Sequence, residues 1–244
     1  MLLSSLLNYK IDSVSGLVPS YNRYLFFPNL IKIWCNQNYD IMNRELVFID
    51  DSDINYVNKI KWDNIPCIIN YYYSSKKLTI GQKRNLLNRL SNGIWLSCFD
   101  DDDYYFEERI NYCISILKKN NKLIGGCSKL YVYSPINNKI YSTNFIGSKH
   151  ATNATLFYHF KFLLISDYNN LDEKGEEKYF LKNFSIDLIQ FDSLKIMIVI
   201  AHLLNTINKY NLLNSFNLTD LNPNMILNTN LINFYKNILI KQLN

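Results

Sequence analysis

Two hydrophobic patterns, one typical of strands and one typical of helices, alternate along the first two-thirds of the chain. Short apolar runs rich in β-branched and aromatic residues predict buried strands, and between them apolar residues recur at helical spacing. Strands that alternate with helices in this way are typical of a mostly parallel sheet covered by helices. The predicted strands are 14–19, 45–51, 66–74 and 94–99, and the predicted helices are 27–38, 80–93 and 105–121.

Local signals place some of the helix ends. Pro28 suits the first turn of the first helix, and Gly93 suits the C-terminal cap of the second. Beyond Leu123 the pattern changes, and two apolar segments joined by Ile136-Asn137-Asn138 predict a β-hairpin. A helix around 175–184, a strand at DLIQF and the run 196–204 complete the core.

The last segment, from Tyr210 onward, is dominated by Asn, Leu and Ile and predicts two helices. No internal repeat and no linker rich in Pro, Gly or Ser divides the chain. We therefore expect an α/β fold with one domain over 1–209 and a helical extension over 210–244 packed on it.

Charge and composition narrow the class of partner. The formal net charge of +5 comes from 26 basic and 21 acidic residues spread along the 244-residue chain, without a dense basic block. This pattern argues against a nucleic-acid partner and suits a small phosphorylated ligand. The richness in Asn, Ile, Lys and Tyr indicates an AT-rich genome, such as that of a virus or microbe.

Cysteine usage and hydropathy indicate a compartment. The five cysteines form no CxxC pair and predict buried free thiols in a reducing environment. The N-terminal apolar run is too short for a secretory signal, and IMIVIA at 196–201 is far below the roughly 20 residues of a transmembrane helix. We expect a soluble cytoplasmic protein, in the host cytoplasm if it is viral, unless a partner carries it to a membrane.

Two predicted strands end in carboxylates, one in Asp50 and Asp51 and the other in Asp100–Asp103. In an open α/β sheet, ligands bind at the carboxyl ends of the strands. If residues 100–103 stay extended, Asp100 and Asp102 project to one side, where a divalent cation would relieve their repulsion. Alternatively, Asp103 caps the following helix and its neighbours face solvent. The tetrad alone does not decide between the two.

The helix that leads into the acidic strand begins with Gly81, Lys83, Arg84 and Asn85. Basic side chains and free backbone N–H groups near a helix N-terminus suit phosphate. The alternative is a solvated basic face.

Together these segments resemble the family 2 glycosyltransferases with the GT-A fold, which are nucleotide-diphospho-sugar transferases. The resemblance covers about 14–206 and is strongest over 80–110, where order and spacing agree as well as residue types. The matching segments are PSYNR at 19–23, Gln37, ELVFIDDSD, IGQKRN, Gly93 and FDDDDYY.

The resemblance implies how a nucleotide-sugar would be held. Asp50 or Asp51 would contact the nucleoside, and Asp102 would bind Mn²⁺ or Mg²⁺ on the diphosphate. With only 7 Gly and no phosphate-binding Gly-rich loop, the chain would rely on the metal to neutralise the diphosphate. The implied donor-binding residues are Pro19, Tyr21, Arg23, Asp50, Asp51, Arg84, Asn85, Asp100 and Asp101, and the implied metal ligands are Asp102, Asp100 and His202.

The resemblance also implies a general base. In the family it is the second acid of a Glu-Asp-like pair, about seventy residues after the Asp-x-Asp, and here Glu176 and Glu177 occupy that place. We assign Glu177 as the base, although the change to Glu-Glu leaves the choice between the two open. Without the resemblance, the pair would be no more than an acidic helix N-terminus.

The histidines are assigned less directly. His202, in IAHLLNT, matches a His-x-x-Asn-Thr ending in which a histidine approaches the metal, but by itself it also fits a core position. His150 would face acceptor or donor phosphate, and His159 would be structural. No Gln-x-x-Arg-Trp motif follows Glu177, which argues against a processive synthase.

The expected activity is a metal-dependent, inverting, non-processive and hexosyltransferase-like sugar transfer. One sugar would move from a nucleotide-sugar, with a UDP-sugar preferred, to a hydroxyl on a glycan, protein or lipid. Two alternatives remain: a nucleotidyltransferase, for which PSYNRY is a poor phosphate loop, and an inactive nucleotide-sugar-binding or scaffold protein.

Overall fold

A computed structural model describes residues 12–60, 65–205 and 209–243. Its central sheet has seven strands in the order β10-β6-β9-β4-β1-β2-β3. β1 pairs in parallel with both β2 and β4, β3 is parallel to β2, and β9 runs antiparallel between β4 and β6. The strands are β1 (Val14–Ser20), β2 (Arg44–Asp50), β3 (Ile68–Tyr73), β4 (Trp95–Cys98), β6 (Ile124–Gly126), β9 (Phe157–His159) and β10 (Ile189–Gln190).

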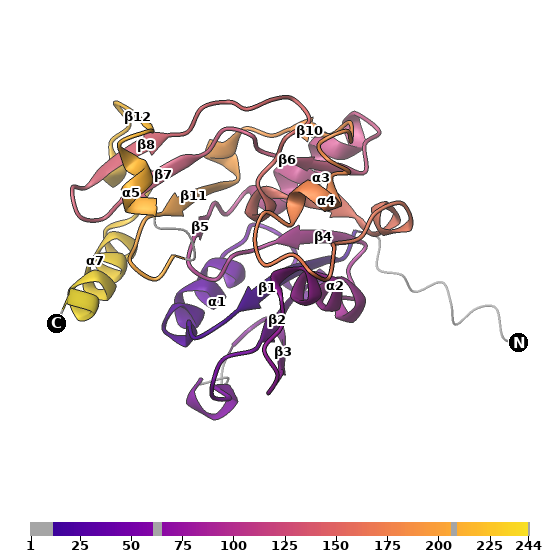
Figure 1. The fold of residues 1–244 in the computed structure, drawn as a ribbon, viewed down its shortest axis with the longest axis horizontal. Helices are drawn as coiled ribbons and strands as arrows, with labels where there is room; N and C mark the ends of the chain where they lie inside the picture. The colour runs from indigo at the N-terminus through magenta and orange to yellow at the C-terminus, as the bar shows by residue number, and fades with distance from the viewer. Residues whose placement is uncertain (1–11, 61–64, 206–208, 244) are drawn as a thin grey trace, which may run out of the picture.

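Helices cover both faces of this sheet (Figure 1). Along β1 the side chains alternate, so Val14 and Val18 join the core cluster of α1 (Phe27–Cys35) and α3 (Arg109–Lys119). Leu17 points to the other cluster, which contains Leu87 of α2 (Ile80–Leu90). β1 and β2 are buried along their whole length, as parallel strands with helices on both faces are expected to be. The α/β class with a mostly parallel sheet is confirmed.

A second, smaller sheet has the order β12-β8-β7-β11-β5. β7 and β8 form the predicted antiparallel hairpin, whereas residues 124–126, expected in the same hairpin, pair in the central sheet instead. β11 runs antiparallel to β5, which directly follows the four aspartates. The strands are β5 (Tyr104–Tyr105), β7 (Tyr131–Ser134), β8 (Lys139–Ser142), β11 (Met197–Ile200) and β12 (Asn217–Leu218).

The C-terminal segment contributes α5 (Lys209–Leu213), α6 (Pro223–Ile226) and α7 (Thr229–Leu243), three helices where two were expected. α7 lies against the start of α1, where the Phe234 and Phe26 rings meet edge to face and Asn29 Nδ2 donates to Tyr235 Oη at 3.4 Å. Among the described helices, none is long and apolar enough to cross a membrane. The remaining short helical elements are η1 (Tyr24–Phe26), η2 (Ile41–Asn43), η3 (Val57–Lys59), η4 (Asn153–Thr155), η5 (Phe160–Leu164), α4 (Glu177–Phe180) and η6 (Ser193–Lys195).

Several helix boundaries differ from the expectation, and the first predicted helix ends at Cys35 rather than at residue 38. α2 ends at Leu90 with Ser91 as its cap, so Gly93 is not the C-terminal cap. A Cβ at Gly93 would lie 2.4 Å from the backbone nitrogen of Ser15, so only glycine lets the two backbone segments pass this close to each other. The helix expected from residue 105 begins at Arg109, because Tyr104 and Tyr105 are drawn into β5.

The helix expected at 175–184 is only the single turn α4, since Lys182, Asn183 and Phe184 adopt positive φ and end it. The polar stretch after residue 51 holds the 3₁₀ turn η3, and its residues 61–64 lie outside the described part. The N-terminal segment 1–11, assessed above as a possible signal, also lies outside it.

Candidate active site

The carboxyl ends of β1, β2 and β4 meet at one edge of the central sheet. The parallel register of these neighbouring strands puts Ser20, Asp50 and the start of the aspartate tetrad side by side. Ser20 Oγ, at the end of β1, donates to Asp101 Oδ2 at 2.6 Å. The topology therefore assembles acids that are far apart in the sequence.

Asp101 and Asp102 face the same cation. Nη1 of Arg23 lies 3.0 Å from Asp101 Oδ1 and 2.8 Å from Asp102 Oδ2, and its Nη2 donates to the Leu204 carbonyl at 2.6 Å. The expected alternation, with Asp101 turned away from Asp102, is wrong because residues 101–102 form a turn and are not extended. Arg23, from the PSYNR segment, is thus the central positive charge of the acid turn.

The outer two aspartates bind different partners. Asp100, with about a third of its side chain exposed, accepts from Arg84 Nη2 at 2.9 Å. Asp103 accepts from the Ile200 backbone N–H at 2.8 Å and lies 3.5 Å from Lys209 Nζ. Asp103 therefore does not cap the following helix, whose N-cap is Glu108. It anchors the end of β11 to the acid turn.

Burial and the surrounding charges set the pKa values of these acids in opposite directions. Burial raises the pKa of Asp101 to about 6 and that of Asp103 to about 7, against the attraction of Arg23 and Lys209 respectively. At Asp102 burial acts the same way, but Arg23, Lys209 and His202 outweigh it and hold the pKa well below its usual range. Asp102 is therefore the member of this buried group that stays ionised most firmly.

His202 reaches the same carboxylate. Its Nε2 lies 2.9 Å from Asp102 Oδ2, and Asn205 Nδ2 donates to that oxygen at 3.1 Å. The side chain of His202 is fully buried, as the alternative of a core position requires, but it also contacts the Asp102 carboxylate. Burial lowers the pKa of His202, which favours the neutral imidazole that binds metals. Sequence reasoning gave Asn205 no role, although it lies in the His-x-x-Asn-Thr motif, whose Thr206 lies outside the described residues.

These donors fit a hard divalent cation that is held jointly with a diphosphate. Mg²⁺ is commonly bound through one or two carboxylates, with substrate phosphates and waters as the other ligands. Asp102 Oδ2 and His202 Nε2 lie 2.9 Å apart, so a cation bound by both would replace the hydrogen bond between them. Within the described residues no group of three or more His, Cys, Asp or Glu side chains forms a closed metal cage.

Asp50 and Asp51 are buried and fixed by neighbours. Asp50 Oδ2 accepts from Tyr71 Oη at 2.6 Å, and its other oxygen accepts from Ser52. Asp51 Oδ1 is 2.7 Å from Lys83 Nζ, which also donates to the Ser20 carbonyl at 3.0 Å. The predicted phosphate-binding lysine is therefore occupied with joining β1 to the end of β2.

Arg84 joins the two groups of acids. Its Nη2 contacts Asp100, and its Nε donates to Glu176 Oε1 at 3.2 Å. Lys83 and Arg84 are both buried, so a solvated basic face is excluded for this pair. Asn85 points elsewhere, because its Nδ2 donates to the Tyr168 carbonyl at 2.7 Å and its Oδ1 accepts from the Tyr168 N–H at 3.0 Å.

The two glutamates before and in α4 have different surroundings. Glu176 Oε1 accepts from Arg84 Nε and from Asn153 Nδ2 at 2.7 Å, and the residue is buried. Among the described residues, no side chain donates a hydrogen bond to the Glu177 carboxylate. Burial, reinforced by the charge of Glu176, raises the pKa of Glu177 to about 7. Glu176 is held in place, and Glu177 is left to exchange a proton near neutrality.

Comparison with known proteins supports the interpretation of this edge. The model of the family described as "Glycosyl transferase family 2" matches residues 15–179, more than half of the chain. The chain belongs to glycosyl transferase family 2. A sequence search of curated proteins finds no match.

Solved structures of glycosyltransferases share the fold. S. aureus TarS 1-349 in complex with UDP-GlcNAc superposes with a TM-score of 0.60 at 14% identity, covering 77% of this chain and 58% of that one. The mannosyltransferase PcManGT from Pyrobaculum calidifontis, in complex with GDP-Man and Mn²⁺, gives 0.64 at 11% identity, covering 80% and 58%. At these identities the likeness shows the GT-A fold. The chain therefore spans less than two thirds of the length of both solved chains.

Other family-matched residues lie around this centre. Pro19 pairs with Ile49 in the sheet register, and half-exposed Tyr21 donates from its Oη to Asp53 Oδ1 at 3.0 Å. Gln37 Nε2 donates to the Phe106 carbonyl at 2.9 Å and so links the end of α1 to the segment before α3. These contacts are structural, and none involves the acids 100–103.

The other two histidines contact none of these acids in the described structure. His150 Nδ1 lies 3.1 Å from Ser128 Oγ, and its ring stacks at an angle on Phe184. His159 packs edge-on against Trp95 within the central sheet, with ring centroids 4.9 Å apart. The ligand-facing role predicted for His150 stays a prediction.

Proposed function

We propose that the chain transfers a single sugar from a nucleotide-sugar to a hydroxyl acceptor, with inversion at the anomeric carbon and without processive elongation. The observation that carries this proposal is Arg84. This buried side chain joins Asp100, at the end of β4, to Glu176, the neighbour of a glutamate whose pKa is about 7. A donor-side acid and an acceptor-side base thereby share one rigid frame.

The diphosphate of the donor would lie against the acid turn. Asp102 and His202 are the residues that would hold Mn²⁺ or Mg²⁺, with Asp100 and Asp101 beside them. A bound divalent cation neutralises charge on a leaving diphosphate. Arg23 contributes a fixed positive charge next to Asp102, at 2.8 Å. The mannosyltransferase PcManGT, solved in complex with Mn²⁺, supports a metal for this fold.

The nucleoside would lie at the ends of β1 and β2. Asp50 and Asp51 are held there by Tyr71 and Lys83, so this wall of the site is preorganised. Pro19 and Tyr21 border the same edge. The structural neighbours were solved in complex with UDP-GlcNAc, UDP and GDP-Man, and we propose a UDP-sugar as the first donor to test, with GDP-mannose second.

Glu177 would act on the acceptor. In an inverting displacement the acceptor oxygen bonds to the anomeric carbon while the bond to the diphosphate oxygen breaks on the opposite face, and the hydroxyl proton must leave. A base with a pKa near the working pH accepts that proton most effectively. The raised pKa of Glu177 meets this condition, whereas the Glu176 carboxylate is engaged by Arg84 and Asn153. The acceptor hydroxyl would belong to a glycan, protein or lipid.

The test is a panel of UDP-, GDP- and CDP-sugars, in which donor hydrolysis and transfer to added alcohols are measured with Mn²⁺, with Mg²⁺ and with a chelator. We expect turnover of one donor class, dependent on the metal. Asp102→Asn should abolish it and Glu177→Gln should lower it by about 10²–10⁴-fold, with Asp167→Asn, an acid that no part of the proposal uses, as matched control. Unchanged turnover in both variants would overturn the proposal.

A further inference from the structure

Two of the five cysteines lie in contact at the edge of the central sheet, away from the acids. Cys35 is the last residue of α1, and Cys67 directly precedes β3. Their sulfur atoms are 2.7 Å apart although the residues are separated by 32 positions. The expectation of buried free thiols holds for Cys98, Cys113 and Cys127, but Cys35 and Cys67 are only partly buried.

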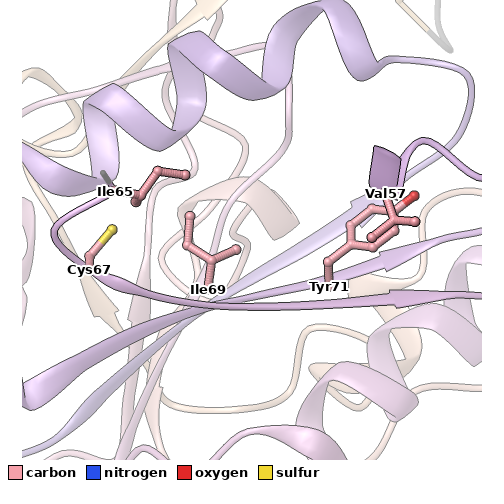
Figure 2. A pocket seen from close by; sticks show the side chains of 5 residues that line it. All are labelled: Val57, Ile65, Cys67, Ile69 and Tyr71. Carbon is pink, nitrogen blue, oxygen red and sulfur yellow. The ribbon is translucent and has the colours of Figure 1, made fainter. Parts of the chain in front are cut away.

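Solvent-sized space reaches this pair. A cavity of about 300 Å³ is lined by Cys67 together with Val57, Ile65, Ile69 and Tyr71. Figure 2 shows the side chains of Cys67, Ile69 and Tyr71 on the same side of the chain, as the two-residue period of a strand requires. Because Cys67 borders this cavity and Cys35 is itself only partly buried, a small reagent can approach the pair without unfolding the sheet.

The surroundings favour the thiolate of Cys35. The contact with Cys67 lowers the pKa of the Cys35 thiol to about 7. Burial raises this pKa, and the nearby Arg44 guanidinium offsets part of that increase. Arg44 is held beside it, since its Nη2 donates to the Cys35 carbonyl at 2.7 Å and its guanidinium stacks over Trp34. A thiolate beside a fixed cation is the reactive form of cysteine.

We propose that Cys35 and Cys67 form a redox-active pair that closes to an intramolecular disulfide on exposure to a small-molecule disulfide such as oxidised glutathione. The Cys35 thiolate attacks one sulfur of the reagent and releases one glutathione thiolate. Cys67, as it loses its proton, then attacks Cys35 Sγ and releases the second. Two electrons pass from the protein to the reagent, and the sulfurs close from 2.7 Å to about 2.05 Å.

The bond would tie the end of α1 to the entrance of the edge strand β3. A cross-link between positions this far apart restricts the unfolded chain and stabilises the fold. The site lies on the same strand as Tyr71, which supports Asp50, so the disulfide would stiffen the outer wall of the candidate active site. The proposal does not depend on the proposed sugar transfer, because the experiment detects the Cys35–Cys67 bond itself and does not measure activity.

To test the proposal, the 244-residue chain is treated with oxidised glutathione under native conditions. Its free thiols are then titrated, and its peptides are mapped without reduction. We expect two of the five thiols to disappear, a peptide containing Cys35 to be linked to one containing Cys67, and dithiothreitol to reverse the change. The melting temperature should rise by on the order of 5–10 °C on oxidation.

Cys35→Ser and Cys67→Ser are the variants, and Cys113→Ser, whose thiol is buried in α3, is the matched control. Each of the first two should lose the linked peptide and the rise in melting temperature, and leave at most a glutathione adduct on the remaining cysteine. The control should still form the link. Five titratable thiols after treatment of the native protein, a different pairing, or a persistent glutathione adduct in place of the link would each overturn the proposal.

Discussion

The acid turn 100–103 and the glutamate pair 176–177 are both clusters of like charge, and the chain treats them differently. Each aspartate in the turn has a cationic partner in Arg23, Arg84 or Lys209, or shares one. In the pair, Glu176 contacts Arg84, whereas Glu177 forms no ion pair with the described residues and has a raised pKa. The difference teaches that the first cluster keeps Asp102 ionised beside Arg23, although burial raises the pKa of Asp101 and Asp103, whereas the second leaves Glu177 able to exchange a proton near neutrality.

The largest effect is expected at the member of the pair that lacks a cationic partner. Glu177→Gln removes the proton acceptor, and loss of a general base lowers turnover by about 10²–10⁴-fold. Binding of the nucleoside diphosphate should stay within about twofold of wild type, since the acid turn is untouched. Steady-state kinetics on the donor found in the panel, together with calorimetry, measures both. If Glu176→Gln loses more turnover than Glu177→Gln at equal stability, the assignment of the base is reversed.

The next effect concerns the cation inside the acid turn. Arg23→Met leaves Asp101 and Asp102 facing each other without their shared partner, and breaking a largely buried ion pair costs about 3 kcal/mol. For a chain of this size the melting temperature would fall by roughly 6–12 °C.

Repeating the melting experiment with Mn²⁺ tests whether the acid turn binds a metal. If the two carboxylates accept a divalent cation, Mn²⁺ should stabilise Arg23→Met more than it stabilises wild type, and Asp102→Asn introduced into the same background should cancel the difference. Calorimetric melting with and without Mn²⁺ gives the comparison. Equal shifts in wild type and Arg23→Met would show that Arg23 does not compete with the metal, and no shift in either protein would show that the turn does not bind it.

A smaller effect is expected where the two clusters are joined. Arg84→Lys keeps the charge but cannot contact Asp100 and Glu176 through a rigid planar fork. We expect turnover to fall about 10–100-fold, with a smaller change in stability than for Arg23→Met. Arg89→Lys, on the exposed face of the same helix, is the control, and kinetics combined with melting curves separates the two. Wild-type kinetics for Arg84→Lys would mean that the clusters work independently.

The smallest effect is a pH dependence. Because the pKa of Glu177 is raised from 4.5 to about 7, the base is ionised above neutrality and protonated below it. The value of kcat/KM should therefore rise about tenfold per pH unit up to about pH 7 and then level off. The rate profile of wild type checks this, and the rising limb should be absent from the residual activity of Glu177→Gln. A profile that is flat between pH 5 and 8 would contradict the assigned role.

The parallel half of the fold could be predicted because its strands are short and rich in apolar residues, with β1 and β2 buried along their whole length, and because Pro28 marks a helix start. What failed depended on distant partners. Tyr105 leaves the predicted helix because β11, some ninety residues later, pairs with it. Gly93 was taken for a helix cap because its close contact with Ser15 has no signature in local sequence.

The candidate site divides in the same way. Spacing located Asp100–Asp103 and the two glutamates, but whether Asp101 turns toward Asp102 depends on a turn that Arg23 and Ser20 stabilise from another strand. Lys209 and Asn153 could not be found, since a single polar residue far along the chain carries no pattern. The choice of Glu177 over Glu176 rests on Arg84, whose side-chain direction only the fold reveals.

The most direct test is the affinity of UDP and GDP measured by calorimetry with and without Mn²⁺, in wild type, Asp102→Asn and Glu177→Gln. We predict binding of one of these nucleotides that requires Mn²⁺, is lost in Asp102→Asn and is kept in Glu177→Gln. Binding that is equally tight without metal and in Asp102→Asn, or no binding of either nucleotide to the wild-type protein, would contradict the account.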